Sequence, residues 1–158
     1  MESRMRGYFG IGIYKAKYDT NLGTLFRTAH NFDAAFCFTI QKAYKPQSSD
    51  TTCFSRHIPL YHYDSINHFF KHIPQDCCLI GVDNNIPPLA NSMPLRSLQT
   101  FNHPERAIYI LGSEINGLPI EILEKCYAII EIKDCKYCLN VATTGAIVMY
   151  DRILKGQK

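Results

Sequence analysis

The chain has 158 residues, which is the size of one ordinary domain and enough to close a hydrophobic core without disulfides or metal ions. Apolar residues make up 46% and charged residues 20%, and no apolar run approaches the length of a membrane span, so the composition is that of a soluble globular protein. The net charge of +3 permits a polyanionic partner without demanding one.

Apolar runs of strand length alternate along the chain with segments of helical period. The predicted elements are, in chain order, a strand over 8–14, a helix over 20–32, a strand over 34–40, a helix over 64–73, strands over 77–83 and 106–112, a helix over 119–126, a strand over 128–132 and a helix over 141–155. Asp64 or Ser65 is the expected N-cap of the second helix, and Pro119 takes the favoured first-turn position of the third. A polar loop over 45–52 and a connection over 84–94 with several Pro and Asn residues complete the pattern.

Several of the predicted strands are apolar throughout, and strands alternate with helices. This pattern is typical of a parallel sheet that helices cover on both faces, so the predicted class is α/β, with a single domain over 1–158. In such sheets ligands bind beyond the carboxyl ends of the strands. The loops after Leu111 and Ile132 are therefore the expected place for a site.

The N-terminal stretch MESRMRGYFGIGIY is basic but lacks the apolar core and cleavage site of a secretory signal, which favours a cytoplasmic protein. Seven cysteines cannot all pair, and in a reducing compartment we expect thiols, most of them as packing residues. Adjacent Cys77 and Cys78 open the apolar run CCLIGVD, where small buried thiols fit a strand.

The first motif is NLGTLFRTA, from Asn21 to Ala29, at the start of the first predicted helix. Asn21 and Gly23 stand where exposed backbone donors and the positive end of the helix dipole favour an anion. Arg27 follows beside an apolar stripe. Taken alone, an arginine in that position is typical of a surface residue with a buried stem.

The second motif is ILGSEINGLP, residues 110–119, in which a strand ends at Leu111 and Gly112. A glycine there lets a ligand approach the backbone, and Gly117 allows a tight return before the next helix. Glu114 has two roles open to it: it can hold the loop by accepting backbone donors, or orient a polar residue of the first motif. The loop is not GxGxxG and has no Walker lysine, which argues against the usual dinucleotide and phosphate loops.

The third motif is CLNVATTGAIVMYD, residues 138–151, in which Asn140 precedes a helix that starts with small residues. A face of small residues lets another segment approach closely and is more often core than site. From this face we expect contact with a second copy of the chain. The motif follows directly on the second candidate ligand loop.

In order, spacing and placement, the three motifs together resemble the SpoU/TrmH family of SPOUT RNA methyltransferases, and the chain is similar to its minimal, single-domain, TrmL-like members. The family patterns are N-x-G-x-x-x-R-[TN]-A, L-G-x-E-x-x-G-[LM] and S-[LM]-N-[VL]-[SA], the last followed by a helix that ends in Y-[ED]. The matching residues are Asn21, Gly23, Arg27, Thr28 and Ala29; Leu111, Gly112, Glu114, Gly117 and Leu118; and Leu139, Asn140, Val141, Ala142, Tyr150 and Asp151. The resemblance spans essentially the whole chain.

The resemblance implies a parallel α/β domain whose C-terminal part passes through a loop as a trefoil knot, and it implies a homodimer. It also implies that the knot loops bind S-adenosylmethionine, mainly through backbone groups. Cys138 stands where the family usually has serine, and a thiol is a weaker hydrogen-bond partner than a hydroxyl. The cofactor-binding residues given by the resemblance are Val82, Leu111, Gly112, Ile132, Cys138 and Leu139.

The implied reaction is methyl transfer to a ribose 2′-hydroxyl of RNA, with tRNA favoured over rRNA because minimal members commonly act on tRNA. Arg27 would hold the adjacent phosphate and stabilise the developing alkoxide, since a guanidinium is almost never deprotonated in proteins. Asn21, Glu114 and Asn140 would orient Arg27 and the ribose. In a dimer, Arg27 would act in its own chain or on the cofactor site of its partner.

Cys135 and Cys138 have the Cys-x-x-Cys spacing of metal and redox sites. A zinc site needs two more ligands, and the sequence has no second Cys-x-x-Cys. His68 and His72 could share a helix face, but they are better explained as polar-face histidines of a short amphipathic helix. A thioredoxin-like pair would start a helix after the first strand, whereas this pair follows the fifth. We therefore expect neither a metal nor a redox site.

Two other functions stay open at this point. One is a knotted RNA-binding protein that has lost methyl transfer and acts as a scaffold or assembly factor, although all four polar motif residues are retained. The other is an RNA methyltransferase that acts on a base nitrogen. The sequence does not name the RNA, and Arg56 and His57 in the loop SSDTTCFSRH are the expected substrate contacts.

Overall fold

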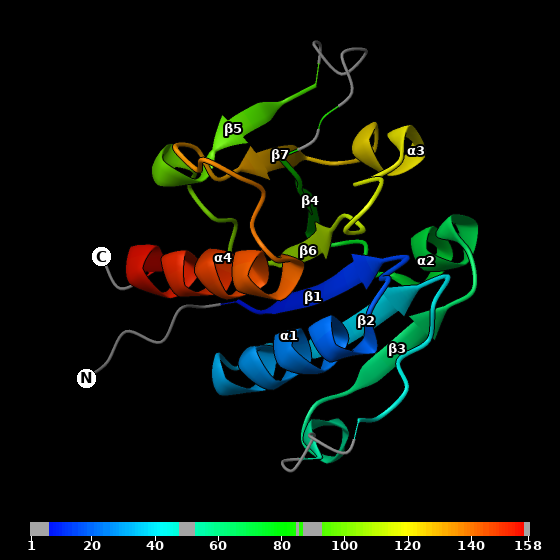
Figure 1. Ribbon diagram of the computed structural model, residues 1–158. Helices are drawn as coiled ribbons and strands as arrows, with labels where there is room; N and C mark the ends of the chain where they lie inside the picture. Colours follow the sequence, from blue (N-terminus) through cyan, green and yellow to red (C-terminus); the bar gives the residue numbers. More distant parts are fainter. Residues whose placement is uncertain (1–6, 48–52, 85, 87–92, 157–158) are drawn as a thin grey trace.

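Seven parallel strands form one sheet in the computed structural model, which describes residues 7–47, 53–84, 86 and 93–156 (Figure 1). They lie in the order β3-β2-β1-β6-β4-β7-β5, and each neighbouring pair is parallel. The carboxyl ends of all seven strands therefore lie on the same side of the sheet, at the end where loops can converge on a ligand. The strands are β1 (Phe9–Tyr14), β2 (Phe36–Ile40), β3 (Leu60–Tyr63), β4 (Cys78–Val82), β5 (Leu95–Ser97), β6 (Ala107–Leu111) and β7 (Ala128–Glu131).

Helices cover both faces of this sheet. The helices α1 (Asp19–Asn31) and α4 (Val141–Gly156) lie side by side on one face and share one hydrophobic cluster with it. The short helices α2 (Ile66–His72) and α3 (Ile120–Leu123) contribute to a second cluster on the opposite face. The predicted α/β class, with a parallel sheet between helices, is confirmed, and the trefoil knot stays a prediction.

The two strands that the sequence did not predict, β3 and β5, are the two edges of the sheet. An inner strand is buried on both faces and therefore has a continuous apolar sequence, such as AIYIL in β6. In contrast, β3 exposes Tyr61 and His62, and the three-residue β5 exposes Leu95 and Arg96. Short edge strands of this kind carry no pattern that separates them from a loop.

The other predicted boundaries lie within two residues of the observed ones, except in α3, which ends at Leu123. Pro119 is the N-cap of α3, with extended backbone, and not its first helical residue. Ser65 is the N-cap of α2, and its hydroxyl accepts a hydrogen bond from the His68 amide at 3.0 Å. No helix that the structure describes is long and apolar enough to cross a membrane. Parts of the predicted loop and connection (48–52, 85 and 87–92) lie outside the described residues.

All seven cysteines are free thiols. Burial raises the pKa of Cys37 and Cys126, the latter to about 12. The expectation of packing residues holds for Cys37 and Cys126, which are buried in the two clusters, and for half-buried Cys77, which packs against the second cluster. Five are half-buried or exposed: Cys53, Cys77, Cys78, Cys135 and Cys138.

The small residues of α4 pack against α1 of the same chain. Gly145 is buried, and a Cβ atom there would lie 2.3 Å from Cδ1 of Leu25. The expectation that this face meets a second copy is therefore wrong, because α1 already covers it. The outward face of α4 instead exposes Ile147, Tyr150 and Leu154.

Arg152 ties the C-terminal half of α4 to the loop before β6. Its side chain is buried, and its Nη1 donates to the carbonyl oxygen of Pro104 at 2.6 Å and to the hydroxyl of Tyr109 at 3.2 Å. Its Nη2 donates to the carbonyl oxygen of Glu105 at 2.7 Å. Among the described residues no carboxylate pairs with this guanidinium, so hydrogen bonds to neutral oxygens are what compensate its burial.

His103 continues this polar network. Its Nδ1 lies 2.6 Å from the Tyr109 hydroxyl, and its Nε2 lies 2.8 Å from Oδ2 of Asp151, which also pairs with Lys155 at 2.7 Å. Since a carboxylate only accepts, a neutral imidazole satisfies both contacts by donating from Nε2 and accepting at Nδ1. Burial lowers the pKa of His103, although the hydrogen bond to Asp151 opposes that shift.

We expect the free energy of unfolding to decrease as the pH falls below about 6.5. The unfolded chain binds a proton at His103 near that ordinary value, whereas the folded chain has a lower pKa, so the contribution is complete above about pH 6.5 and is lost as the pH falls to the folded value. Urea unfolding between pH 5 and 8 measures this slope. In His103→Gln the slope should be shallower, and an unchanged slope would contradict the assignment.

Candidate functional site

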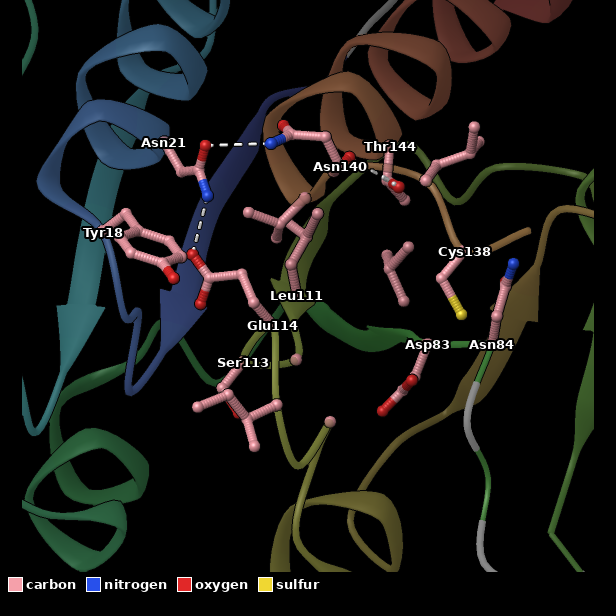
Figure 2. Close-up of a pocket in the computed structure, with 16 residues that line it drawn as sticks. Tyr18, Asn21, Asp83, Asn84, Leu111, Ser113, Glu114, Cys138, Asn140 and Thr144 are labelled. Carbon is pink, nitrogen blue, oxygen red and sulfur yellow. Dashed lines mark hydrogen bonds between the residues drawn. The ribbon is translucent and has the colours of Figure 1, made fainter.

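A pocket of about 450 Å³ lies at the carboxyl ends of β4 and β6, between the first turns of α1 and α4 (Figure 2). Residues from all three sequence motifs line it. The lining consists of Tyr18 and Asn21, residues 82–84 after β4, residues 111–115 and 117 after β6, and residues 138–141 and 144 at the start of α4. The prediction that the loop after Leu111 forms a site agrees with this position.

A hydrogen-bonded relay joins one polar residue from each motif. Nδ2 of Asn140 donates to Oδ1 of Asn21 at 2.9 Å, and Nδ2 of Asn21 donates to Oε1 of Glu114 at 2.8 Å (Figure 2). Oδ1 of Asn140 accepts from the amides of Ala142 and Thr143 at 2.9 and 3.3 Å, which makes Asn140 the N-cap of α4. Because the side-chain oxygen of Asn140 caps the helix, its side-chain amide nitrogen must be the donor to Asn21. This assigns the oxygen and nitrogen positions in the side-chain amides of both asparagines.

Glu114 ends this relay as a carboxylate. Burial alone would raise its pKa, but the hydrogen bonds from the Asn21 side chain and from the amide of Lys17, the latter at 2.8 Å, outweigh burial and lower the pKa overall. Of the two roles open to Glu114, it therefore fills both: it accepts a backbone donor and it orients Asn21. Its carboxylate accepts hydrogen bonds from Lys17 and Asn21, so within one chain Glu114 does not orient Arg27.

We expect Asn140→Ala to lower the free energy of unfolding by about 1 kcal/mol, because the first turn of α4 loses its cap. Asn140→Asp should restore this stability, since a carboxylate still caps and favours the helix dipole. Aspartate cannot donate to Asn21, however, so any activity that depends on this donor should stay low in both variants. Chemical unfolding and a turnover assay separate the two effects, and wild-type turnover in Asn140→Asp would mean that the donor to Asn21 is dispensable.

The loop after β6 is closed by two glycines. Two backbone hydrogen bonds, at 3.1 and 3.3 Å, join Ser113 and Gly117, and Gly117 makes the predicted tight return with φ +64°. A Cβ at Gly117 would also lie 2.4 Å from Oδ2 of Asp83, which accepts from the Leu118 amide at 2.7 Å. A Cβ at Gly112 would lie 2.7 Å from Cα of Gly117, so this glycine makes room for the backbone of its own loop, where we expected room for a ligand.

Most of the predicted site residues meet at this pocket. Asn21, Glu114 and Asn140 line it, as do five of the six predicted cofactor-binding residues. Ile132 does not; its amide donates to Oδ1 of Asn84 and its carbonyl oxygen accepts from Nδ2 of the same side chain. The five that line it are Val82, Leu111, Gly112, Cys138 and Leu139.

Arg27 lies apart from this pocket. It is exposed on α1, six residues after Asn21, which is about 9 Å along the helix axis and about 120° around it. It makes no hydrogen bond or ion pair with any residue that the structure describes. Within one chain, the relay therefore does not orient the guanidinium group of Arg27.

Three pocket residues lie outside the three motifs and were not predicted from the sequence: Tyr18, Asp83 and Asn84. Asp83 and Asn84 stand directly after β4, so the rule that ligands bind beyond strand carboxyl ends could have found them. Tyr18 carries no such signal. Among the described residues, no three potential ligands of the His, Cys, Asp and Glu types are grouped in a way that could hold a metal ion.

A model of the SpoU rRNA methylase family matches residues 9–150. A structure solved to study the 2-OH methylation of C/U34 on tRNA superposes with a TM-score of 0.77 at 18% identity, over 95% of this chain and 97% of that one. The AdoMet-bound rRNA methyltransferase from Sinorhizobium meliloti superposes with a TM-score of 0.78 at 18% identity, over 96% of this chain and 60% of that one.

The SpoU methyltransferase AviRb from Streptomyces viridochromogenes, in complex with AdoMet, gives a TM-score of 0.78 at 16% identity, over 95% of this chain and 58% of that one. The chain thus spans nearly all of the first structure and about three-fifths of the other two. At these identities the likeness shows the fold alone. The comparison with curated proteins gave no match.

Proposed function

Because this chain belongs to the SpoU rRNA methylase family of S-adenosylmethionine-dependent RNA methyltransferases, we propose that it transfers the methyl group to a ribose 2′-hydroxyl, with tRNA as the favoured substrate. The observation that carries the proposal is the relay of Asn21, Glu114 and Asn140. These residues are up to 119 positions apart in the sequence, yet they form one hydrogen-bonded unit on the wall of one pocket.

The pocket suits S-adenosylmethionine in its charge. Two carboxylates, Asp83 and Glu114, line it, and none of the described lysine or arginine residues does. Both a sulfonium and an ammonium group are cations, so an acidic lining is electrostatically complementary to this ligand. Backbone groups near Val82, Gly112 and Leu139 would hold it, and when bound it would supply an electrophilic methyl group.

The residues of the chain then have to position the RNA. The acceptor hydroxyl must meet the methyl group in line, and a fixed relay on the pocket wall holds that geometry at little entropic cost. Asn21 and Asn140 can orient the ribose because their own amides are already locked by Glu114 and by the α4 helix start. Arg27 would hold the neighbouring phosphate and stabilise the developing alkoxide.

The exposed position of Arg27 favours action across a homodimer. The outward face of α4 exposes Ile147, Tyr150 and Leu154, whose spacing makes one apolar stripe along the helix. A second copy packed on this stripe would bury it and could bring Arg27 of the partner subunit to the pocket.

Sedimentation of Tyr150→Glu tests this arrangement. The variant should be monomeric at micromolar concentration, where the wild-type chain and the matched control Tyr127→Glu are dimeric. Tyr127 is also exposed but lies directly before β7, away from the stripe. A monomeric wild-type chain, or a dimeric Tyr150→Glu, would contradict the interface.

The RNA is proposed to lie along α1 and the turn η1 (Phe54–Arg56). The ring of His57 stacks on that of His30, with centroids 5.1 Å apart and planes 16° apart, and buried Phe54 fixes the turn against α1. Arg27 and His30 share one side of α1 because they are three residues apart. Arg27 and Arg56 are exposed and form no ion pair with any described residue, so both guanidinium groups are available for phosphates.

Mass spectrometry of nucleosides tests the reaction. Total tRNA and total rRNA are incubated separately with the protein and labelled S-adenosylmethionine and then digested. The expected product is a 2′-O-methylnucleoside, found mainly in tRNA. A labelled base would indicate base methylation, and binding of RNA without any labelled product would indicate a scaffold; either result would overturn the proposal.

A further inference from the structure

One carboxamide holds both backbone polar groups of Ile132. Oδ1 of Asn84 accepts from the Ile132 amide at 3.1 Å, and Nδ2 of Asn84 donates to the Ile132 carbonyl oxygen at 3.3 Å. Asn84 follows β4 and Ile132 follows β7. The last backbone contact between these two segments has the Asp83 amide donating to the carbonyl oxygen of Ile130 at 3.2 Å. The Asn84 side chain therefore continues the pairing in place of the next peptide group.

This contact explains why Asn84 lines the pocket and Ile132 does not. Asn84 is exposed and stands with Cys138 on the side of the pocket opposite the relay of Asn21 and Glu114 (Figure 2). The donor and acceptor of Ile132 are thus covered by a side chain that itself faces the pocket. An exposed side chain can rotate away far more easily than a strand can unpair, since it gives up only its own contacts.

Adenine has the hydrogen-bonding pattern of a carboxamide. Its exocyclic amine is a donor and stands beside a ring nitrogen that accepts, just as the amine of asparagine stands beside an oxygen that accepts. The amide and carbonyl of Ile132 complement both groups equally. Given the proposed function, which brings an adenosyl group to this pocket, we propose that Asn84 occupies the hydrogen-bonding site of the adenine in the free chain and leaves it when the cofactor binds.

The exchange makes Asn84 a determinant of cofactor affinity. Each binding event has to break the two hydrogen bonds between Asn84 and Ile132, so the observed affinity is lower than that of an open site. In return, the two backbone groups of Ile132 stay paired when no adenine is present. The alternative is a purely structural contact that shapes the loop for the ligand, and this alternative predicts the opposite effect of removing the side chain.

Calorimetry with S-adenosylhomocysteine, which carries the adenosyl group without the reactive methyl, distinguishes the two. We expect Asn84→Ala to bind about tenfold more tightly than the wild-type chain, because two neutral hydrogen bonds no longer have to be broken. The matched control is Asn116→Ala, the same substitution at an exposed asparagine on the neighbouring loop that does not line the pocket. It should bind like the wild-type chain.

Hydrogen exchange at the Ile132 amide gives a readout that does not depend on activity. Exchange should be slow in the free wild-type chain, fast in free Asn84→Ala, and slow again in Asn84→Ala once the ligand is bound. Asn84→Ser, whose side chain is too short to make both contacts, provides a second variant if Asn84→Ala does not fold.

The results separate this inference from the proposed function. If the wild-type chain binds S-adenosylhomocysteine and Asn84→Ala binds it equally or less tightly, the proposed replacement of Asn84 by adenine is wrong and the proposed function stands. Slow hydrogen exchange at the Ile132 amide in free Asn84→Ala would also overturn the proposed replacement of Asn84 by adenine. If neither the wild-type chain nor the variants bind S-adenosylhomocysteine, the proposed function fails, and the proposed replacement of Asn84 by adenine fails with it.

Discussion

Arg27→Ala should lose methyl transfer by roughly 100- to 1000-fold, which is the usual effect of removing one group that stabilises developing negative charge. The cofactor dissociation constant should not change, because the proposed contacts of Arg27 are with the RNA phosphate and the acceptor hydroxyl, and Arg27 does not line the pocket of its own chain. Calorimetry with S-adenosylhomocysteine and a single-turnover assay with labelled cofactor measure the two quantities. Wild-type turnover in Arg27→Ala would mean that the guanidinium takes no part in the reaction.

Arg106→Ala is the matched control for this variant. Arg106 is also an exposed arginine, but it pairs with Asp76 at 2.6 Å and precedes β6, at the opposite end of the strands from the pocket. Its replacement removes the same charge from the protein without touching α1. Its transfer rate should therefore stay near that of the wild-type chain.

Complementation decides whether Arg27 acts across subunits. Arg27→Ala and Asn140→Ala chains are each expected to be poorly active, and they are combined by co-expression. In a mixed dimer, an intact relay would face an intact Arg27 of the partner subunit at one of the two pockets if the arginine acts across the interface. Activity of the mixture should then exceed that of either variant alone. No gain would indicate that Arg27 acts at the pocket of its own chain.

Arg152→Ala should lower the free energy of unfolding by about 3 kcal/mol, or roughly 6–12 °C in Tm. The change leaves a cavity under α4 and removes the donors to the carbonyl oxygens of Pro104 and Glu105 and to the Tyr109 hydroxyl. The aromatic ring of Phe9, 5.3 Å from the guanidinium carbon, also loses its cation. Chemical and thermal unfolding measure the loss.

Arg152→Met separates the hydrogen bonds from the volume that the side chain fills. If the hydrogen bonds stabilise the fold, this variant should be almost as unstable as Arg152→Ala. A buried charge also costs desolvation, so Arg152→Met at wild-type stability or above would show that the guanidinium brings no net stabilisation. Arg106→Ala again serves as the exposed control, with an expected loss below about 1 kcal/mol.

The sequence predicted the inner part of the fold because burial on both faces leaves a continuous apolar run in each inner strand. It did not predict β3 or β5, since a strand with one neighbour and exposed Tyr61 or Arg96 has the composition of a loop. The role of the small-residue face of α4 was also predicted wrongly. Small residues such as Gly145 show that something packs closely, but they do not say whether α1 or a second chain does so.

The candidate site was predicted in its members more than in its contacts. Motif resemblance selected Asn21, Glu114 and Asn140, whose positions on separate elements no local pattern relates to one another. That Glu114 serves Asn21, and that Asn84 covers Ile132, depends on hydrogen-bond geometry, which periodicity does not contain. The separation of Arg27 from the pocket follows from its angle on α1 and could have been derived from helix geometry.

The position of β1 between β2 and β6 leaves one side of this strand unpaired during synthesis. On one side β1 pairs with β2, where Ile11 is in register with Cys37, but on the other it pairs with β6, where Ile11 is in register with Tyr109. The second partner is made 98 residues after Ile11, which takes about 5–20 s at ordinary rates of translation. Throughout that interval an apolar strand has an open edge, so this chain should need a holdase chaperone during its synthesis more than a protein whose sheet grows in sequence order.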